Sequence, residues 1–147
     1  MTDAGNTPWH ILGAGAMGTL FAHRLSAAGL PVVLVGREAR GTVLHTLRTA
    51  DGDRERPFSV EGPGSPGTVA RLLVTVKAPS VVAAVNALAP RLAPAAVVVV
   101  LANGRGYREA LASCLGRRPL YRGVTSEGAY RESETLTVHA GSGRTRI

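Results

Sequence analysis

The residues with the clearest chemical potential form a glycine-rich hexapeptide near the N-terminus. It follows the apolar segment 9–12, precedes a segment with helical spacing at 19–29, and consists of Gly13, Ala14, Gly15, Ala16, Met17 and Gly18. In such a loop the first glycine permits a tight turn, the second lets backbone N–H groups approach a pyrophosphate, and the third lets a helix pack closely on a strand. The helix N-terminus favours an anion. The context predicts a dinucleotide-binding loop; the alternative is a merely flexible turn.

The end of the next apolar run, 31–36, indicates which dinucleotide would bind. NAD-binding domains usually carry an acidic residue there, whose carboxylate accepts hydrogen bonds from the ribose 2′-hydroxyl. This chain has Arg37 followed by Glu38, and a guanidinium suits a 2′-phosphate. We therefore expect NADP(H), with Arg40 either assisting Arg37 or solvated. The expectation reverses if Glu38, rather than Arg37, turns toward the ribose.

Two further polar residues follow later apolar runs. Lys77, the only lysine of the chain, follows 69–76, and Asn103 ends the run 94–103. If both runs are strands of one parallel sheet, both residues lie at its carboxyl edge, where open α/β sheets bind ligands. We expect both beside the nicotinamide end of a bound dinucleotide, with Lys77 acting as a compact point donor. The alternatives are an ordinary turn at Asn103 and a composition that is simply rich in arginine.

The elements that must position these residues alternate between strands and helices. Strands are expected at 9–12, 31–36, 69–76 and 94–103, and helices at 19–29, 80–92 and 107–116. The intervening stretches predict a short helix at 41–50, a polar loop at 51–57, a short strand and a loop within 119–131, and a β-hairpin with a Ser-Gly turn at 135–147. Together they predict an α/β domain of the Rossmann type, with a doubly wound, mostly parallel sheet, flanking helices and a C-terminal β-hairpin. Residues 1–8 are expected to be a polar tail and 9–147 the domain.

Composition excludes several other classes of function. The chain has 147 residues and a formal charge of +7, but its arginines are scattered and not interleaved with aromatic residues, so we expect no nucleic-acid binding. The longest apolar run is too short to span a membrane. One cysteine and four histidines without ligand spacing predict no metal site. The N-terminus lacks the pattern of a secretory signal, so the expected location is the cytoplasm.

The order of the motifs resembles that of the ketopantoate reductase (2-dehydropantoate 2-reductase) family. The resemblance runs through GAGAMG, GRE, LLVTVKAPS, ANGRG, GVTSEGA and TVHAGSGRTRI, which cover nearly the whole chain after the tail. Members of that family use NADPH to reduce ketopantoate to pantoate on the route to pantothenate and coenzyme A. The resemblance implies that the glycine loop holds the pyrophosphate and that Arg37 reads the 2′-phosphate. It also implies that Lys77 lies beside the cofactor ribose, that Asn103 touches cofactor and substrate, and that the backbone of Ala129 contacts the cofactor.

The departures from the family pattern limit what this chain is expected to do. Family members are about twice as long, and their second, all-helical domain supplies the lysine that donates the proton. The family motif rich in Thr with a His reads Thr125-Ser126-Glu127-Gly128 here, and the sequence stops inside the expected last hairpin strand. A fragment, a gene remnant and a naturally short paralogue are all open.

These departures predict a chain that is inactive alone. Lys77 and Asn103 would position cofactor and substrate, and a ketopantoate-like 2-oxo acid would bind only if a helical domain were supplied. Apolar surface left at the missing domain's docking face predicts self-association. The alternative is a noncatalytic NADP-binding sensor or subunit.

Overall fold

The computed structural model describes residues 5–147, so residues 1–4 of the expected tail lie outside it. A nine-stranded sheet runs through the molecule in the order β7-β6-β5-β1-β2-β4-β3-β10-β9. Its strands are β1 (Trp9–Leu12), β2 (Val32–Val35), β3 (Gly41–Thr49), β4 (Gly52–Glu61), β5 (Val69–Val74), β6 (Leu92–Val100), β7 (Leu120–Arg122), β9 (Gly128–Ser133) and β10 (Leu136–Gly141). A separate pair joins β8 (Val124–Thr125) to β11 (Thr145–Arg146). The helices are α1 (Ala16–Ala27), α2 (Val81–Leu88) and α3 (Tyr107–Leu115), with single 3-10 turns η1 (Ala78–Ser80) and η2 (Ala89–Arg91).

The parallel half of the sheet confirms the predicted Rossmann-type fold. Strands β7, β6, β5, β1 and β2 are all parallel. Strands β2, β5 and β6 contain continuous apolar runs, as expected for strands that are covered on both faces. Helices α2 and α3 pack on one face, around Leu72, Val85 and Leu111, which are fully buried. Helix α1 lies on the other face, where Phe21 and Ala22 pack against Ile11. No helix within residues 5–147 has the length and apolarity that crossing a bilayer would require.

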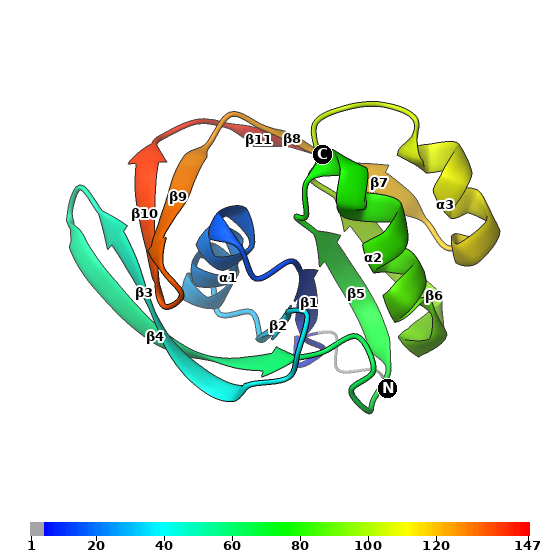
Figure 1. Cartoon of the computed structure of the whole chain (residues 1–147), viewed down its shortest axis with the longest axis horizontal. Helices are drawn as coiled ribbons and strands as arrows, with labels where there is room; N and C mark the ends of the chain where they lie inside the picture. The colour runs from blue at the N-terminus through cyan, green and yellow to red at the C-terminus, as the bar shows by residue number, and fades with distance from the viewer. Residues whose placement is uncertain (1–4) are drawn as a thin grey trace.

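The outer half of the sheet curves around α1, so that this helix lies inside an arc of strands (Figure 1). Strands β3 and β4 form a long antiparallel ladder that pairs Gly41 with Val60 at one end and Thr49 with Gly52 at the other. Strand β10 then pairs with β3 in parallel and with β9 in antiparallel orientation. The sheet is therefore a Rossmann core extended by a second, curved layer that covers the far side of α1.

Two expectations for this outer half were wrong. Residues 41–50 form β3 instead of a helix, and the expected loop 51–57 belongs almost entirely to β4. The stretch 41–50 contains several β-branched residues, which lose side-chain freedom in a helix and pack well on a pleated surface. The local pattern looked helical because burial in β3 is confined to its second half, at His45 and Leu47.

The expected hairpin at 135–147 was also wrong in its position. The hairpin of the structure is formed by β9 and β10, and its turn lies at Glu134–Thr135, not at Ser142-Gly143. Both hydrogen-bonding edges of β10 are occupied, one by β9 and the other by β3. Residues after Gly141 therefore have no free edge of β10 to pair with, and Thr145 pairs with Thr125 of β8 instead.

Candidate functional site

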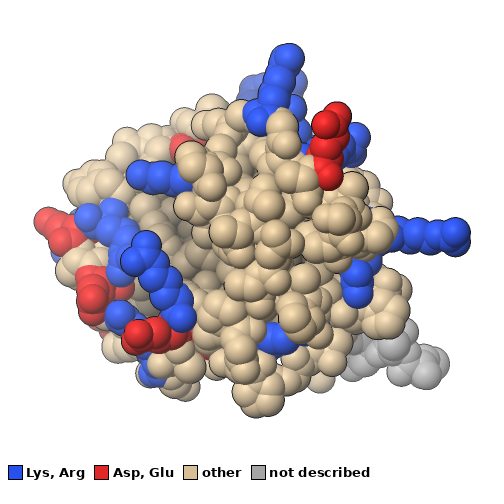
Figure 2. Space-filling view, turned by 45° about the vertical axis from the view of Figure 1, so that its right-hand side comes forward, with Lys and Arg blue, Asp and Glu red and all other residues tan. Residues whose placement is uncertain are grey.

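A groove of about 1260 Å³ opens between the Rossmann core and the curved outer strands. It lies at the carboxyl ends of β1, β2 and β5, and its far wall is the tip of the β9–β10 hairpin, residues 131–134. Figure 2 shows this hollow bordered by basic and acidic side chains, whereas the surface over α2 is largely uncharged. Of the residues that the sequence singled out, the groove is lined by Gly13, Ala14, Gly15, Ala16, Met17, Arg37, Lys77 and Ala129. The structure thus brings most of the expected site together.

The glycine loop, residues 13–18, forms the floor of the groove through very close packing. Gly13 has φ of +112°, a conformation that side chains other than glycine rarely adopt. A Cβ on Gly18 would lie 1.7 Å from the carbonyl oxygen of Gly13, so α1 approaches the loop too closely for any side chain there. A Cβ on Gly15 would meet nothing within 4 Å. Gly18 is therefore required for packing and does not line the groove, while Gly15 faces open space.

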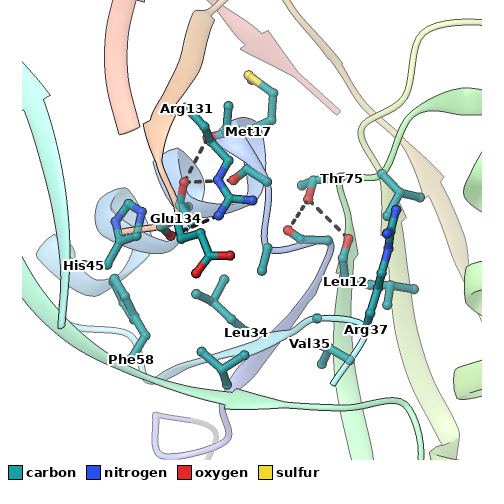
Figure 3. A pocket seen from close by; sticks show the side chains of 18 of the residues that line it. Leu12, Met17, Leu34, Val35, Arg37, His45, Phe58, Thr75, Arg131 and Glu134 are labelled. Carbon is teal, nitrogen blue, oxygen red and sulfur yellow. Dashed lines mark hydrogen bonds between the residues drawn. The ribbon is translucent and has the colours of Figure 1, made fainter. Parts of the chain in front are cut away.

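Thr75 fixes this loop to the neighbouring strand. Its hydroxyl lies 3.2 Å from the carbonyl oxygen of Leu12 and 3.1 Å from that of Gly13, and it lines the groove (Figure 3). Because a hydroxyl has a single proton, it is shared between these two acceptors. The start of the loop is thereby fixed to the segment that follows β5, just before the first turn of α1.

The rim of the groove carries more free positive than negative charge, because among the described residues that line it only Glu38 is a carboxylate without a partner. Arg37 and Lys77 are both exposed, and neither side chain makes a hydrogen bond or ion pair within residues 5–147. Arg40 differs, because its guanidinium donates to the carboxylate of Glu134 across the groove, at 3.2 Å. Two free cations beside an open helix N-terminus make the groove suited to a ligand with several negative charges.

Asn103 lies outside the groove. It is exposed on the loop between β6 and α3, next to the glycine-containing turn at Gly104. This loop does approach the segment after Lys77, since a Cβ on Gly104 would lie 3.4 Å from the Cβ of Ala78. The structure therefore places Asn103 at the adjacent strand end, as expected, but beside the groove rather than in its wall.

The sequence did not indicate that the hairpin tip lines the groove. Arg131, Glu132, Ser133 and Glu134 all do so, together with Thr75 and His45. The tip was missed because the hairpin was expected several residues later in the chain. The expected hairpin began at residue 135 and so included β10, but the largely exposed and polar β9 offers no apolar alternation from which it could be predicted.

A buried chain of hydrogen bonds ties α1 to the curved outer strands. The hydroxyl of Thr19 lies 2.7 Å from that of Thr137, the Thr137 hydroxyl lies 3.3 Å from Nε2 of His45, and Nδ1 of His45 lies 3.0 Å from Nε2 of His23. All four residues are at most 3% exposed. Thr19 and His45 also line the groove, so this series of hydrogen bonds supports the groove wall.

The direction of these bonds follows from their fixed end. The Thr19 hydroxyl must donate to the carbonyl oxygen of Gly15, 2.8 Å away, because a carbonyl only accepts. Thr137 therefore donates to Thr19 and accepts from Nε2–H of His45. Nδ1 of His45 then accepts from Nε2–H of His23. This leaves Nδ1 of His23 as a buried lone pair without a partner among the described residues.

The same burial keeps both histidines neutral. Desolvation, with smaller contributions from His45 and Arg56, lowers the pKa of His23 from 6.5 to about 4. Desolvation, followed by the nearby guanidinium of Arg131, also lowers the pKa of His45. Both shifts disfavour the charged ring, because neither imidazolium would have a carboxylate partner in this part of the core.

A second polar contact fastens the base of the hairpin to α1. The carboxylate of Glu127, only 5% exposed, accepts hydrogen bonds from Arg24 of α1 and from His139 of β10. The bond from Arg24, with further help from His139, lowers the pKa of Glu127 to about 2 although burial opposes the shift. Glu127 belongs to the stretch 125–128 that departs from the family motif, and here it links α1 to β10.

Replacing His23 with Gln is expected to weaken the pH dependence of stability. Between pH 6.5 and about 4 the unfolded chain binds a proton at His23 that the folded chain does not. The contribution of His23 to the free energy of unfolding is therefore complete above that window. It is lost as the pH falls through the window, by at most about 1.4 kcal/mol per pH unit. Gln keeps an N–H for His45 but does not titrate. Urea unfolding across the window measures the slope, and equal slopes for both proteins would contradict the expectation.

Alanine at Gly18 is expected to lower the free energy of unfolding, whereas alanine at Gly15 is expected to leave it nearly unchanged. Gly18→Ala forces atoms into contact with the Gly13 carbonyl and is expected to lower the free energy of unfolding by about 1–3 kcal/mol or more. Gly15→Ala is expected to change it by less than about 0.5 kcal/mol, because its φ of −85° suits alanine and the space is open. Chemical denaturation of the matched pair tests this, and similar losses in both variants would show that the packing argument is wrong.

Comparison with known proteins agrees with the geometry. The family model described as "Ketopantoate reductase PanE/ApbA" matches residues 9–147. The 2-dehydropantoate 2-reductase of Vibrio cholerae serotype O1 is 33% identical over 139 residues, covering 93% of this chain and 45% of that protein. The enzyme of the same name from Archaeoglobus fulgidus is 34% identical over 140 residues, again covering 93% of this chain and 45% of its own length.

Solved structures show the same fold. The 2-dehydropantoate 2-reductase from Geobacter metallireducens GS-15 superimposes with a TM-score of 0.79 at 26% identity, covering 94% of this chain and 48% of that one. A D-mandelate dehydrogenase solved with NADH and anilino(oxo)acetate has a TM-score of 0.83 at 20% identity, covering 95% of this chain and 47% of its own, and is similar in fold alone. The chain spans about half the length of these relatives. On the match over residues 9–147, it belongs to the ketopantoate reductase family.

Proposed function

We propose that this chain binds NADP(H) and forms the cofactor-binding half of a 2-dehydropantoate 2-reductase-like oxidoreductase. The observation that carries the proposal is the open glycine loop at the start of α1, with the unpaired Arg37 at the rim of the same groove. The absence of any atom within 4 Å of a Cβ on Gly15 leaves room for a phosphate against the backbone. The reductases to which the chain is similar, and the NADH bound to the D-mandelate dehydrogenase of similar fold, support a nicotinamide cofactor.

Different residues of the groove would bind different parts of the cofactor. Residues 13–17 and the N-terminus of α1 would bind the pyrophosphate through backbone N–H groups. Arg37 would bind the 2′-phosphate through its planar fork. Lys77 and the backbone of Ala129 would lie near the nicotinamide end, with Asn103 beside them. When bound, NADPH supplies the hydride for reduction of a 2-oxo acid; these residues orient it and exclude water.

Specificity for NADPH over NADH is expected to depend on Arg37. Fluorescence titration of the purified chain should show tighter binding of NADPH. Arg37→Met is expected to weaken NADPH binding roughly 10- to 100-fold, the loss typical of a hydrogen bond to a charged group, with little effect on NADH. Arg54→Met, which removes an exposed arginine outside the groove, is the matched control. Equal affinities for both dinucleotides in the wild type would instead indicate that Glu38 faces the ribose.

The chain alone is expected to turn over 2-dehydropantoate negligibly. Within residues 5–147 the groove offers only Lys77 as an amine, and the resemblance assigns that position to the cofactor ribose and proton donation to a residue of the second domain. Loss of a general acid typically lowers the rate by about 10²–10⁴-fold, and loss of the substrate pocket lowers it further. The absorbance of NADPH measures the rate, with a full-length family enzyme as control. Turnover at an ordinary enzymatic rate would refute this expectation.

A further inference from the structure

The hairpin tip, residues 131–134, places one arginine inside the groove. Figure 3 shows Arg131 extending from β9 toward the side of the groove formed by α1, whereas Arg37 lies across the groove beyond Val35. Along a strand, alternate side chains share a face. Ala129 and Arg131 are such a pair, and both line the groove, whereas a register shift at Glu132 separates Arg131 from Ser133. The orientation of Arg131 is therefore a property of the strand and not of a flexible surface side chain alone.

The hydrogen-bonded ladder fixes how close Arg131 is to the glycine loop. Arg131 pairs in register with Thr137 of β10. The hydroxyl of Thr137 lies 2.7 Å from that of Thr19, which itself lies 2.8 Å from the carbonyl oxygen of Gly15. A short series of rigid, buried contacts thus connects the backbone of Arg131 to the N-terminal turn of α1. Because its strand lies beside this turn, the long side chain can reach a ligand bound at the helix N-terminus.

The charge of Arg131 remains available for a ligand. The two glutamates of the hairpin tip already have other partners, since Glu134 binds Arg40 at 3.2 Å and Glu132 binds Arg48 at 3.1 Å. Arg131 itself donates Nη2–H to the main-chain carbonyl of Glu134, at 3.0 Å, and makes no ion pair within residues 5–147. That bond orients the guanidinium, and most of its N–H donors stay free.

We propose that Arg131 binds the pyrophosphate of the dinucleotide from the hairpin side, opposite the backbone N–H groups of the glycine loop. This inference rests on the proposed function, which it deepens by adding a side-chain ligand supplied by the outer strands. A guanidinium can hold two phosphate oxygens with parallel hydrogen bonds. The bound pyrophosphate would then be contacted by α1 on one side and by β9 on the other, and it would join the two halves of the sheet.

The test compares ligands that differ in their phosphates. NADPH and NADH both carry the pyrophosphate, whereas 2′-AMP carries a 2′-phosphate without one. Arg131→Met is expected to weaken the binding of NADPH and of NADH by the same factor, roughly 10- to 100-fold. The affinity for 2′-AMP is expected to stay unchanged. Arg131→Lys keeps the positive charge but not the planar guanidinium, so this variant should lose less affinity for the two dinucleotides than Arg131→Met. Arg54→Met, the control for net charge, should leave all three affinities unchanged.

Each outcome decides between distinct assignments. Unchanged binding of both dinucleotides by Arg131→Met overturns the inference while the proposed function stands. A loss confined to NADPH and 2′-AMP also overturns it, and assigns Arg131 to the 2′-phosphate. If the wild type binds neither dinucleotide, the proposed function fails as well. Urea unfolding checks that each variant is folded. If Arg131→Met does not fold, the affinities of Arg131→Lys are compared with those of the wild type instead.

Discussion

The close approach of Gly18 to the carbonyl of Gly13 is the constraint on which the placement of α1 depends. It sets the distance between α1 and the sheet, because no atom fits between the helix and the loop at that point. The N-terminus of α1 consequently opens directly into the groove, and Thr19, one residue further on, lies where its hydroxyl can bond to the Gly15 carbonyl. The outer strands take their position from Thr19, through Thr137. A single close approach thus places both the floor of the groove and the wall that faces it.

Covering α1 on both sides has an energetic cost that the polar contacts offset. The helix carries Thr19 and His23 into a region that the outer strands close from water. Buried polar groups stabilise a protein only when they are hydrogen-bonded. The Thr19–Thr137–His45–His23 chain satisfies nearly all of them with neutral groups, and Glu127 adds a charged clamp where α1 is nearer to solvent. These bonds also specify one register between the outer strands and the helix, which apolar packing alone would specify less strictly.

The parts of the fold that could be predicted are those whose signals are local. The strand at 9–12, the glycine loop and the runs that form β5 and β6 can each be recognised within a few residues, so the Rossmann core was confirmed and most residues of the expected site line one groove. The β3–β4 ladder was not predictable in this way, because half of β3 is exposed and its alternation is broken. The parallel pairing of β10 with β3 was inaccessible to local patterns, and with it the placement of the hairpin tip and of Arg131. Asn103 is an intermediate case: it follows the expected strand, but it does not line the groove.

The pairing of β10 with β3 also has a consequence for how the chain acquires its structure. Leu136 pairs with Thr46, residues separated by most of the length of the chain. Contacts so distant in sequence close late, because the entropy of a large loop must be lost before they form, and they slow folding. During synthesis, which begins at the N-terminus, α1 and the β3–β4 ladder therefore emerge long before the strand that covers them. Until residues 136–141 arrive, the polar side chains of α1 face water and the edge of β3 is open to any other strand, which makes this edge the point at which a nascent chain is most exposed to mispairing.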